Sequence, residues 1–195
     1  MLVSAIIADL RNRLNDNIAS GNTVSEYLDA EFIKFINDAL REFCRIMKCY
    51  TLSETTPTAT SHTLIGIFQP DTVLVDGVIV NESTFRELLD SYSTAVGEPR
   101  YYYVENNKVN LFPKEDATTY NIQVVGYATK AITATTDNID FLPTDYFSIL
   151  IDLCEYKSIQ SRITSDGNNL RMQYLLNNIN TFYNIEGKLN ASISR

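Results

Sequence analysis

The middle of the chain contains the stretch Thr72-Val73-Leu74-Val75-Asp76-Gly77-Val78-Ile79-Val80. β-Branched residues on both sides of an Asp-Gly pair are typical of two antiparallel strands joined by a two-residue turn. A second pattern of this kind surrounds Asn106-Asn107, between the runs 101–104 and 108–112. A further strand is predicted over Tyr120–Tyr127, where Ile122 and Val124 share one face. The sequence therefore predicts a small sheet in the middle of the chain.

Helical periodicity flanks this segment on both sides. Near the start of the chain, one helical face carries Leu2, Ile6, Leu10 and Leu14. From about Asp29 a wider apolar stripe contains Phe32, Phe35, Ile36, Ala39, Leu40, Phe43 and Met47. After Leu142-Pro143 one helix carries Phe147, Leu150, Ile151 and Cys154, and a last helix carries Leu170, Tyr174, Leu175, Ile179, Phe182 and Ile185. Amphipathic helices bury their apolar faces most simply against one another.

These patterns predict an α+β fold that is mainly an α-helical bundle. The N-terminal and C-terminal helices form the bundle, and a central β-hairpin or small sheet is inserted between them. We expect helices in residues 1–50 and 142–195, a β-rich insertion in residues 51–141, and a single domain over 1–195. The patterns assign no element to the Thr- and Ser-rich stretch 51–63.

Composition narrows the classes of function. The 195 residues include 24 acidic and 16 basic side chains, for a net charge of −8. Such an acidic chain is a poor candidate for wrapping nucleic acid, because that binding relies on Lys and Arg. The excess acidity lies in residues 51–141, with 12 acids against 5 bases. No apolar run approaches the ~20 residues of a membrane span, and no basic segment precedes the first apolar stretch, so we expect neither a membrane anchor nor a signal peptide.

Residues able to support catalysis are few and poorly spaced. His62 is the only histidine, and its setting before a strand favours a surface or turn position. Cys44 and Cys49 are five residues apart, so a continuous helix would place them on different faces. Cys154 falls on an apolar stripe and is expected in the core. We find no P-loop, G-x-G-x-x-G or H-E-x-x-H motif. The sequence predicts no enzyme, no cofactor and no metal site.

A set of short motifs resembles the tailed-bacteriophage head-to-tail adaptor (connector) family. Gly97-Glu98-Pro99-Arg100-Tyr101-Tyr102-Tyr103, followed by Val109-Asn110-Leu111-Phe112-Pro113, is similar to a G-x-P-x-x-Y … i-x-L-x-P signature of that family. The strand Ile122–Tyr127, the Phe141–Tyr146 opening of a helix and the helical Ile36-Asn37-Asp38-Ala39 follow the family's order. The resemblance covers most of residues 28–190.

This resemblance implies a structural protein of the virion neck, assembled in the host cytoplasm. Such adaptors form a homo-oligomeric ring, commonly of about twelve copies, below the portal protein and above a tail or neck protein. The ring extends the channel through which genomic DNA passes, without specific DNA binding and away from any membrane. An acidic lumen would repel phosphates and let DNA slide.

Candidate contact residues follow from the exposed turns and the aromatic strand. We expect axial contacts at Asp76, Gly77, Asn106 and Asn107, in the two hairpin turns. Tyr101 and Tyr103 lie on one face of a strand, where half-buried tyrosines or interface anchors are favoured over a stacking platform for single-stranded nucleic acid. The C-terminal segment that ends at Arg195 is expected to become ordered on docking to the portal.

Three other interpretations remain open. The chain is alternatively another neck or tail-completion protein of a phage. It is alternatively a small DNA-binding packaging or regulatory protein that uses Arg41, Arg45 and Lys48, the richest basic helix segment. The last alternative is a metal-dependent hydrolase built on Asp137, Asp140 and Asp145, since carboxylates are typical Mg²⁺ and Ca²⁺ ligands.

Overall fold

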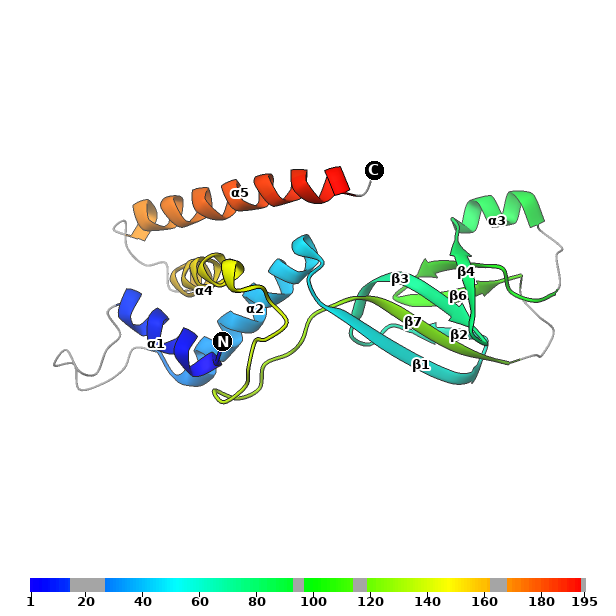
Figure 1. Ribbon diagram of the computed structural model, residues 1–195, viewed down its shortest axis with the longest axis horizontal. Helices are drawn as coiled ribbons and strands as arrows, with labels where there is room; N and C mark the ends of the chain where they lie inside the picture. The colour runs from blue at the N-terminus through cyan, green and yellow to red at the C-terminus, as the bar shows by residue number, and fades with distance from the viewer. Residues whose placement is uncertain (15–26, 93–96, 114–118, 162–167, 194–195) are drawn as a thin grey trace. The chain divides into compact units, whose positions relative to one another are not determined.

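The computed structural model describes residues 1–14, 27–92, 97–113, 119–161 and 168–193. Two compact units make up the chain (Figure 1). The helical unit joins Met1–Tyr50 to Lys130–Arg195, and the sheet unit is Thr51–Thr129. Whether the two units unfold as the single domain expected over 1–195 stays a prediction, because compact units unfold either together or separately.

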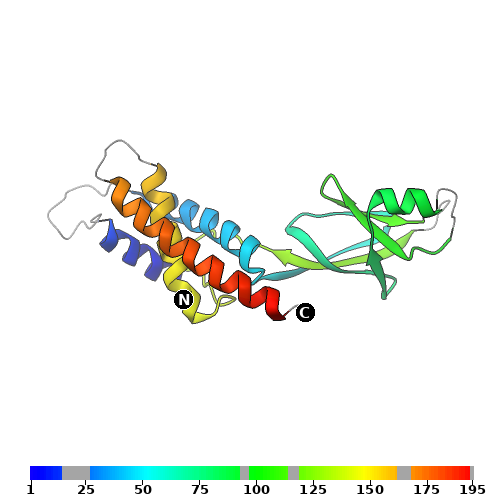
Figure 2. The ribbon, with the colours of Figure 1, turned by 90° about the horizontal axis from the view of Figure 1, so that it is seen from above.

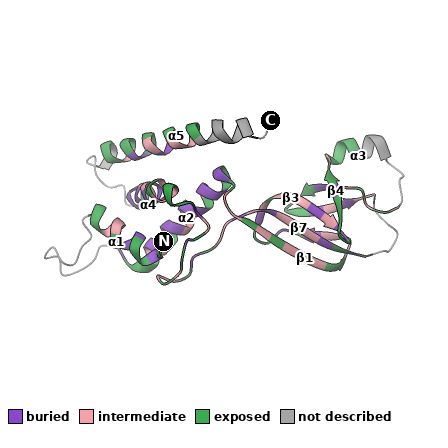
Figure 3. Cartoon of the chain, viewed as in Figure 1, coloured by how far each residue is buried: buried purple, intermediate pink, exposed green. Residues whose placement is uncertain are grey.

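The helical unit contains the four helices that the sequence predicts. They are α1 (Val3–Arg13), α2 (Asp29–Met47), α4 (Phe147–Ser161, after the 3₁₀ turn η2 at Thr144–Tyr146) and α5 (Asn168–Ile193), shown in Figure 2. The apolar stripe of α2 lies in the core of this unit, where Phe32, Ile36, Ala39, Leu40 and Phe43 are fully buried. Figure 3 shows the same buried face along α2 and α4. The positions of these four helices therefore agree with the periodicity of the sequence.

The loop before η2 holds the two halves of the helical unit together. The side-chain amide of Asn37 donates to the carbonyl of Ile132, and the Ile132 N–H donates back to Oδ1 of Asn37, both at 2.8 Å. The N–H groups of Val3 and Ser4 donate to carbonyl oxygens of the same loop, at 3.0 and 2.9 Å. These bonds satisfy donors that the start of α1 would otherwise leave unpaired. The asparagine of the motif Ile36-Asn37-Asp38-Ala39 thus has a structural role.

A charged network connects α1, α4 and α5. Glu155 on α4 is 1 % exposed, and its carboxylate accepts two hydrogen bonds from Arg171, at 2.7 and 2.9 Å. Arg13 of α1 reaches Asp152 at 2.7 Å and Glu155 at 3.4 Å. A buried carboxylate is tolerable only with such partners, because removing it from water costs several kcal/mol. The network therefore fixes three helices in one arrangement.

The sheet unit is larger than the predicted insertion. Its strands are β1 (Thr51–Ala59), β2 (Ser61–Thr63), β3 (Ile67–Val75), β4 (Val78–Glu82), β5 (Tyr101–Glu105), β6 (Lys108–Phe112) and β7 (Tyr120–Ala128), with helix α3 (Phe85–Tyr92) between β4 and β5. They form one sheet in the order β1-β7-β3-β4-β5-β6-β2. All neighbours are antiparallel except β4 and β5, which are parallel.

The two edge strands of this sheet, β1 and β2, are consecutive in the chain and bring the sheet close to closing as a barrel. The predicted helical bundle with a small hairpin insertion is therefore wrong, and the fold is a mixed α/β one with a seven-stranded, nearly closed sheet. The missing strands come from residues 51–63. β1 alternates between exposed and half-buried residues and has no fully buried position, so it lacks the apolar alternation that marks a strand in a sequence.

Close approach of two strands requires one particular glycine. Gly126 of β7 faces the irregular part of β3, where the register shifts between Pro70 and Thr72. A Cβ atom at position 126 would lie 2.8 Å from the Cα of Pro70 and would also collide with the Gln69 carbonyl oxygen. A residue without a side chain is therefore needed where β3 bends across β7.

Candidate interaction surfaces

The Asp76-Gly77 turn is an exposed tip of the sheet. Both residues have positive φ angles, 49° and 83°, as a two-residue hairpin requires. Asp76 also binds β7, because its carboxylate accepts from the Asn121 N–H at 2.8 Å. Beside the turn, Val78 and Ile79 are 67 % and 66 % exposed. The predicted turn is confirmed, and it carries apolar side chains that face solvent.

The Asn106-Asn107 turn has the same backbone geometry and a firmer anchor. Its φ angles are 50° and 60°. The Asn107 amide donates to the Leu64 carbonyl at 2.6 Å, and the Leu64 N–H donates to the Asn107 carbonyl at 3.0 Å. Both residues are exposed, and Asn107 also holds the segment between β2 and β3. Asn107, one of the two residues predicted for contacts at this turn, thus stabilises the sheet unit itself through its hydrogen bonds with Leu64.

The two turns lie at opposite ends of the sheet. β4 begins directly after Gly77, and β5 ends directly before Asn106. Because β4 and β5 run parallel, with Asn81 opposite Tyr101, the start of one and the end of the other point in opposite directions. The sheet unit therefore presents two separate tips.

The tyrosines of β5 are covered rather than presented as a platform. Tyr103 is 8 % exposed, and its ring lies 4.9 Å from the ring of Phe85 on α3. Tyr102 is 3 % exposed, and burial, with the charges of Glu82 and Asp71, raises its pKa to about 12. Tyr101 is half-buried. Both faces of β5 are thus occupied, and a contact role for Tyr101 or Tyr103 stays a prediction. Arg195 lies outside the described residues.

His62 is the site that sequence reasoning placed wrongly. It is buried in β2, 3 % exposed, and not on a surface or in a turn. Its Nε2 donates to the Glu54 carboxylate at 2.8 Å, and its Nδ1 is joined to the Thr56 hydroxyl at 2.6 Å. Both partners belong to β1, so side chains join the two edge strands of the sheet. We call this set, Glu54, Thr56 and His62, the seam.

Glu54 is saturated with hydrogen bonds. Besides His62, its carboxylate accepts the backbone N–H groups of Ile65, Gly66 and Ile67, at 3.1, 2.6 and 3.2 Å. Burial favours a raised pKa for Glu54, but the bonds from Gly66, His62 and the two neighbouring N–H groups outweigh it and lower the pKa. A hydroxyl, an imidazole and a carboxylate in this order also occur in nucleophilic triads. Here the carboxylate binds the segment before β3 and the histidine of β2, so its role is structural.

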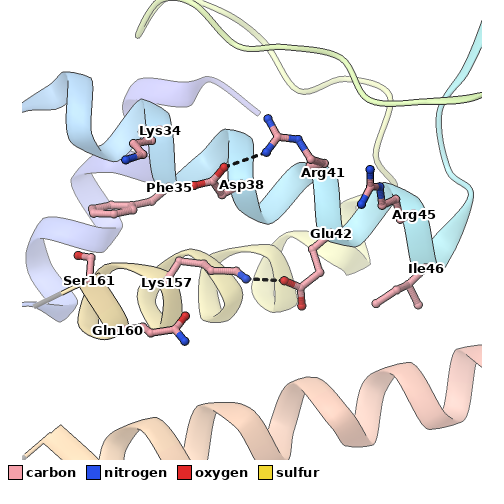
Figure 4. Close-up of a pocket in the computed structure, with 10 residues that line it drawn as sticks. All are labelled: Lys34, Phe35, Asp38, Arg41, Glu42, Arg45, Ile46, Lys157, Gln160 and Ser161. Carbon is pink, nitrogen blue, oxygen red and sulfur yellow. Dashed lines mark hydrogen bonds and ion pairs between the residues drawn. The ribbon is translucent and has the colours of Figure 1, made fainter. Parts of the chain in front are cut away.

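Arg41 and Arg45, two of the three basic residues considered for DNA binding, lie along a groove between α2 and α4 (Figure 4). The third, Lys48, follows the end of α2 and is not among the residues that line the groove. This α2–α4 groove has a volume of about 680 Å³. Its charged lining comprises Lys34, Arg41, Arg45 and Lys157 with Asp38 and Glu42. Arg41 pairs with Asp38 at 3.2 Å, and Lys157 pairs with Glu42 at 2.5 Å. The groove is thus lined by both signs of charge, and two of its four cations form ion pairs with its own carboxylates.

Two of the three carboxylates considered for a metal are engaged elsewhere. Asp137 accepts the N–H groups of Thr133 and Ala134, at 2.7 and 3.0 Å, and these bonds lower its pKa. Asp140 lies 3.7 Å from Lys130. Across the residues that the structure describes, no three His, Cys, Asp or Glu side chains gather as a metal site would require. The structure therefore does not bring Asp137, Asp140 and Asp145 together.

Cys44 and Cys49 are neighbours in space, contrary to the prediction. α2 ends at Met47, and Lys48 adopts a left-handed conformation with φ of 51°, so the chain turns back. The two Sγ atoms lie 3.6 Å apart, and their hydrogen bond raises the pKa of Cys44 and lowers that of Cys49. The prediction assumed a continuous helix through Cys49, but α2 ends at Met47, so the rotation of about 100° per residue does not apply to Cys49. Cys154 is fully buried, as predicted.

The helical unit carries a charged groove, and the barrel-like sheet unit carries exposed turns. These are surfaces for contact with other molecules, so the fold and its surfaces are those of an interaction protein. The sequence model of the SU10 adaptor protein family matches residues 1–176, so the chain belongs to this family of phage head-to-tail adaptors. The comparison with curated proteins finds no match. None of the described helices combines the length and apolar character that crossing a bilayer requires.

Family membership confirms the resemblance drawn from the motifs and makes the protein a bacteriophage structural adaptor. The family is generally non-enzymatic. Membership also implies contacts with phage portal or tail proteins and a place in the virion neck.

Proposed function

We propose that this protein is a ring-forming subunit that binds beneath the portal, extends the DNA channel and docks the tail. The family match over residues 1–176 carries the proposal. About twelve copies would form the ring, as the resemblance to adaptors implies, after synthesis in the host cytoplasm. Another neck or tail-completion role is the alternative within the same class.

The two sheet tips support a role between two axial partners. A subunit placed between a portal and a tail needs contact surfaces that face opposite ways. The turns Asp76-Gly77 and Asn106-Asn107 lie at opposite ends of one sheet. The exposed Val78 and Ile79 beside the first turn give that tip apolar area to bury against a partner. The segment ending at Arg195 is a further candidate for contact with the portal.

Charge supports passage of DNA without binding. Residues 51–129, the sheet unit, contain ten acidic and four basic side chains, whereas the rest of the chain is close to neutral. A lumen lined by such a unit repels the phosphate backbone. Specific binding through Arg41, Arg45 and Lys48 is less favoured, because Arg41 already pairs with Asp38 and the segment also carries Glu42.

Electron microscopy of the purified chain, with and without the portal of its phage, tests the proposal. We expect mostly monomers alone and closed rings on the portal. A chain that binds purified tail but never the portal would be a tail-completion protein. A chain that binds neither, and instead retains DNA in a gel shift at physiological salt, would contradict the adaptor role.

A further inference from the structure

We propose that Cys44 and Cys49 are a redox-active pair, which peroxide oxidises to a disulfide that locks the end of α2. The two Sγ atoms already lie 3.6 Å apart and share a hydrogen bond. A disulfide holds its sulfurs about 2.05 Å apart, so the two side chains need to approach by only about 1.5 Å. Formation of this bond does not depend on the proposed ring, and only its timing rests on the proposed function.

The turn between the two cysteines holds them in this position. The N–H of Lys48 donates to the carbonyl of Cys44 at 2.9 Å, and Lys48 has a φ angle of 51°. A residue with a Cβ atom adopts this left-handed conformation at a cost in free energy, and glycine is the usual residue where a helix ends in this way. The chain thus keeps a less favourable turn here, and this turn places the two thiols side by side.

The two thiols differ in accessibility, as a nucleophile and a resolving thiol do. Cys44 is fully buried in α2, whereas Cys49 is half-buried beyond the end of the helix. The hydrogen bond between them lowers the pKa of Cys49, and the same bond, with burial, raises the pKa of Cys44. Small oxidants react first with a thiol that is partly exposed and has a lowered pKa. Cys49 is therefore the nucleophile, and Cys44 completes the bond.

The reaction balances with hydrogen peroxide as the oxidant. The Cys49 thiolate attacks one peroxide oxygen, the O–O bond breaks, and hydroxide leaves and takes up the proton that Cys49 released. The product is a sulfenic acid on Cys49. The Cys44 thiol then attacks the sulfenic sulfur, so that an S–S bond forms, the S–O bond breaks, and the hydroxyl leaves as water with the thiol proton. Two thiols are oxidised, and one peroxide is reduced to two waters.

The disulfide would act where the chain leaves the helical unit. The helical unit ends at Tyr50 and the sheet unit begins at Thr51, directly after Cys49. A covalent link from α2 to Cys49 would keep the last turn before this crossing from opening. Thiols stay reduced in the cytosol, whereas disulfides persist on virion surfaces. A subunit made in the host cytoplasm would thus carry the dithiol and become locked in the released particle.

Peptide mapping of the purified full chain tests the bond. The reduced chain is treated with hydrogen peroxide, unfolded, and alkylated at its remaining thiols. We expect the loss of two hydrogen atoms from the intact mass and one alkylated cysteine in place of three. Because trypsin cleaves after Arg41, Arg45, Lys48 and Arg86, the disulfide joins peptide 42–45 to peptide 49–86. Added oxygen at Cys49 without this link, or a link through Cys154 or a second chain, would overturn the proposal.

Substitutions separate the roles of the thiols. Cys44→Ala is expected to stop at the sulfenic acid, which dimedone traps on Cys49, and Cys49→Ser is expected to keep both remaining thiols. Cys154→Ala is the matched control and should form the disulfide as the wild type does, because Cys154 is fully buried and burial raises its pKa. Circular dichroism checks that each variant folds. A folded Cys44→Ala chain without a dimedone adduct on Cys49 would overturn the assignment of the nucleophile.

Hydrogen exchange tests the lock. Amides of residues 45–50 are expected to exchange at least about tenfold more slowly in the oxidised chain than in the reduced chain, and equal exchange would overturn the lock. Released phage particles, alkylated before they are taken apart, are expected to yield the linked peptide. Particles that hold this chain only as the dithiol would overturn the timing, whereas particles that lack this chain would refute the proposed function instead.

Discussion

Replacing Glu54 with alanine removes the carboxylate that joins the two edge strands of the sheet. Four donors lose their acceptor: His62 Nε2 and the N–H groups of Ile65, Gly66 and Ile67. The N–H groups of Ile65 and Gly66 are exposed and regain water. The bonds from His62 and Ile67 are partly buried, so these two donors are left poorly satisfied.

The size of the effect follows from those two donors. A buried donor without a partner costs about 1–3 kcal/mol. Two such donors, discounted for partial exposure, predict that Glu54→Ala destabilises the sheet unit by about 2–4 kcal/mol. Glu98→Ala is the matched control, because Glu98 is an exposed carboxylate of the same unit. The control is expected to change stability by less than about 0.5 kcal/mol.

Hydrogen exchange followed by mass spectrometry measures the effect where it occurs. Amides of β1, β2 and β7 are expected to exchange at least about 30-fold faster in Glu54→Ala, which corresponds to 2 kcal/mol. Amides of the helical unit report whether the two units open together, as a single domain requires. Equal exchange in Glu54→Ala and Glu98→Ala would refute the idea that the seam holds the edge strands.

Lowering the pH tests the contribution of the Glu54 carboxylate without removing its side chain. The pKa of Glu54 is lowered in the fold, so its contribution is present above the pKa of an unperturbed Glu, about 4.3, and is lost as the pH falls through the lower folded value. Glu54→Gln removes this titration while keeping the shape. Urea unfolding between pH 7 and pH 3 is expected to show a weaker acid dependence in Glu54→Gln than in the wild type. Identical pH profiles would show that Glu54 does not contribute.

Three further predictions address other parts of the molecule. Gly126→Ala is expected to destabilise the sheet unit by more than about 2 kcal/mol, because the new Cβ collides with β3; Gly77→Ala, which has open space but a positive φ, should cost only about 1 kcal/mol in urea unfolding. Glu155→Ala is expected to cost about 3 kcal/mol, and adding Arg171→Ala should cost less than the sum of the single changes, which a double-mutant cycle measures. Ile79→Ser is expected to leave the melting temperature nearly unchanged and to weaken binding to the portal or tail in a pull-down, whereas unchanged binding would exclude that tip as a contact.

Elements with a strong local pattern were predictable. The stripe of α2 needed only the helical repeat, and the tip Asp76-Gly77 needed only two residues that accept positive φ. The motifs around Tyr101 and Phe112 also indicated the correct family, although the structure gives Tyr103 a packing role against Phe85. In each case the signal lies within a few neighbouring residues.

The contact surfaces were less accessible to sequence reasoning. The segment Arg41–Lys48 was recognisable as basic, but its pairing with α4 across a groove depends on Lys157, more than a hundred residues later. Cys44 and Cys49 became neighbours because α2 ends before Lys48, and the end of a helix is poorly marked in a sequence. The parallel register of β4 and β5 decided that the two turns face opposite ways.

The sequence by itself determined the helices, the two tight turns and the excess of acid in the middle, because periodicity, turn chemistry and charge are local properties. Only the tertiary structure decided that residues 51–63 are strands and that the sheet nearly closes. β1 is polar and never fully buried, and it becomes a strand because β7, some seventy residues later, supplies its hydrogen-bond partners. His62 and Glu54 carry no pattern of their own, and they meet because the edges of the sheet meet.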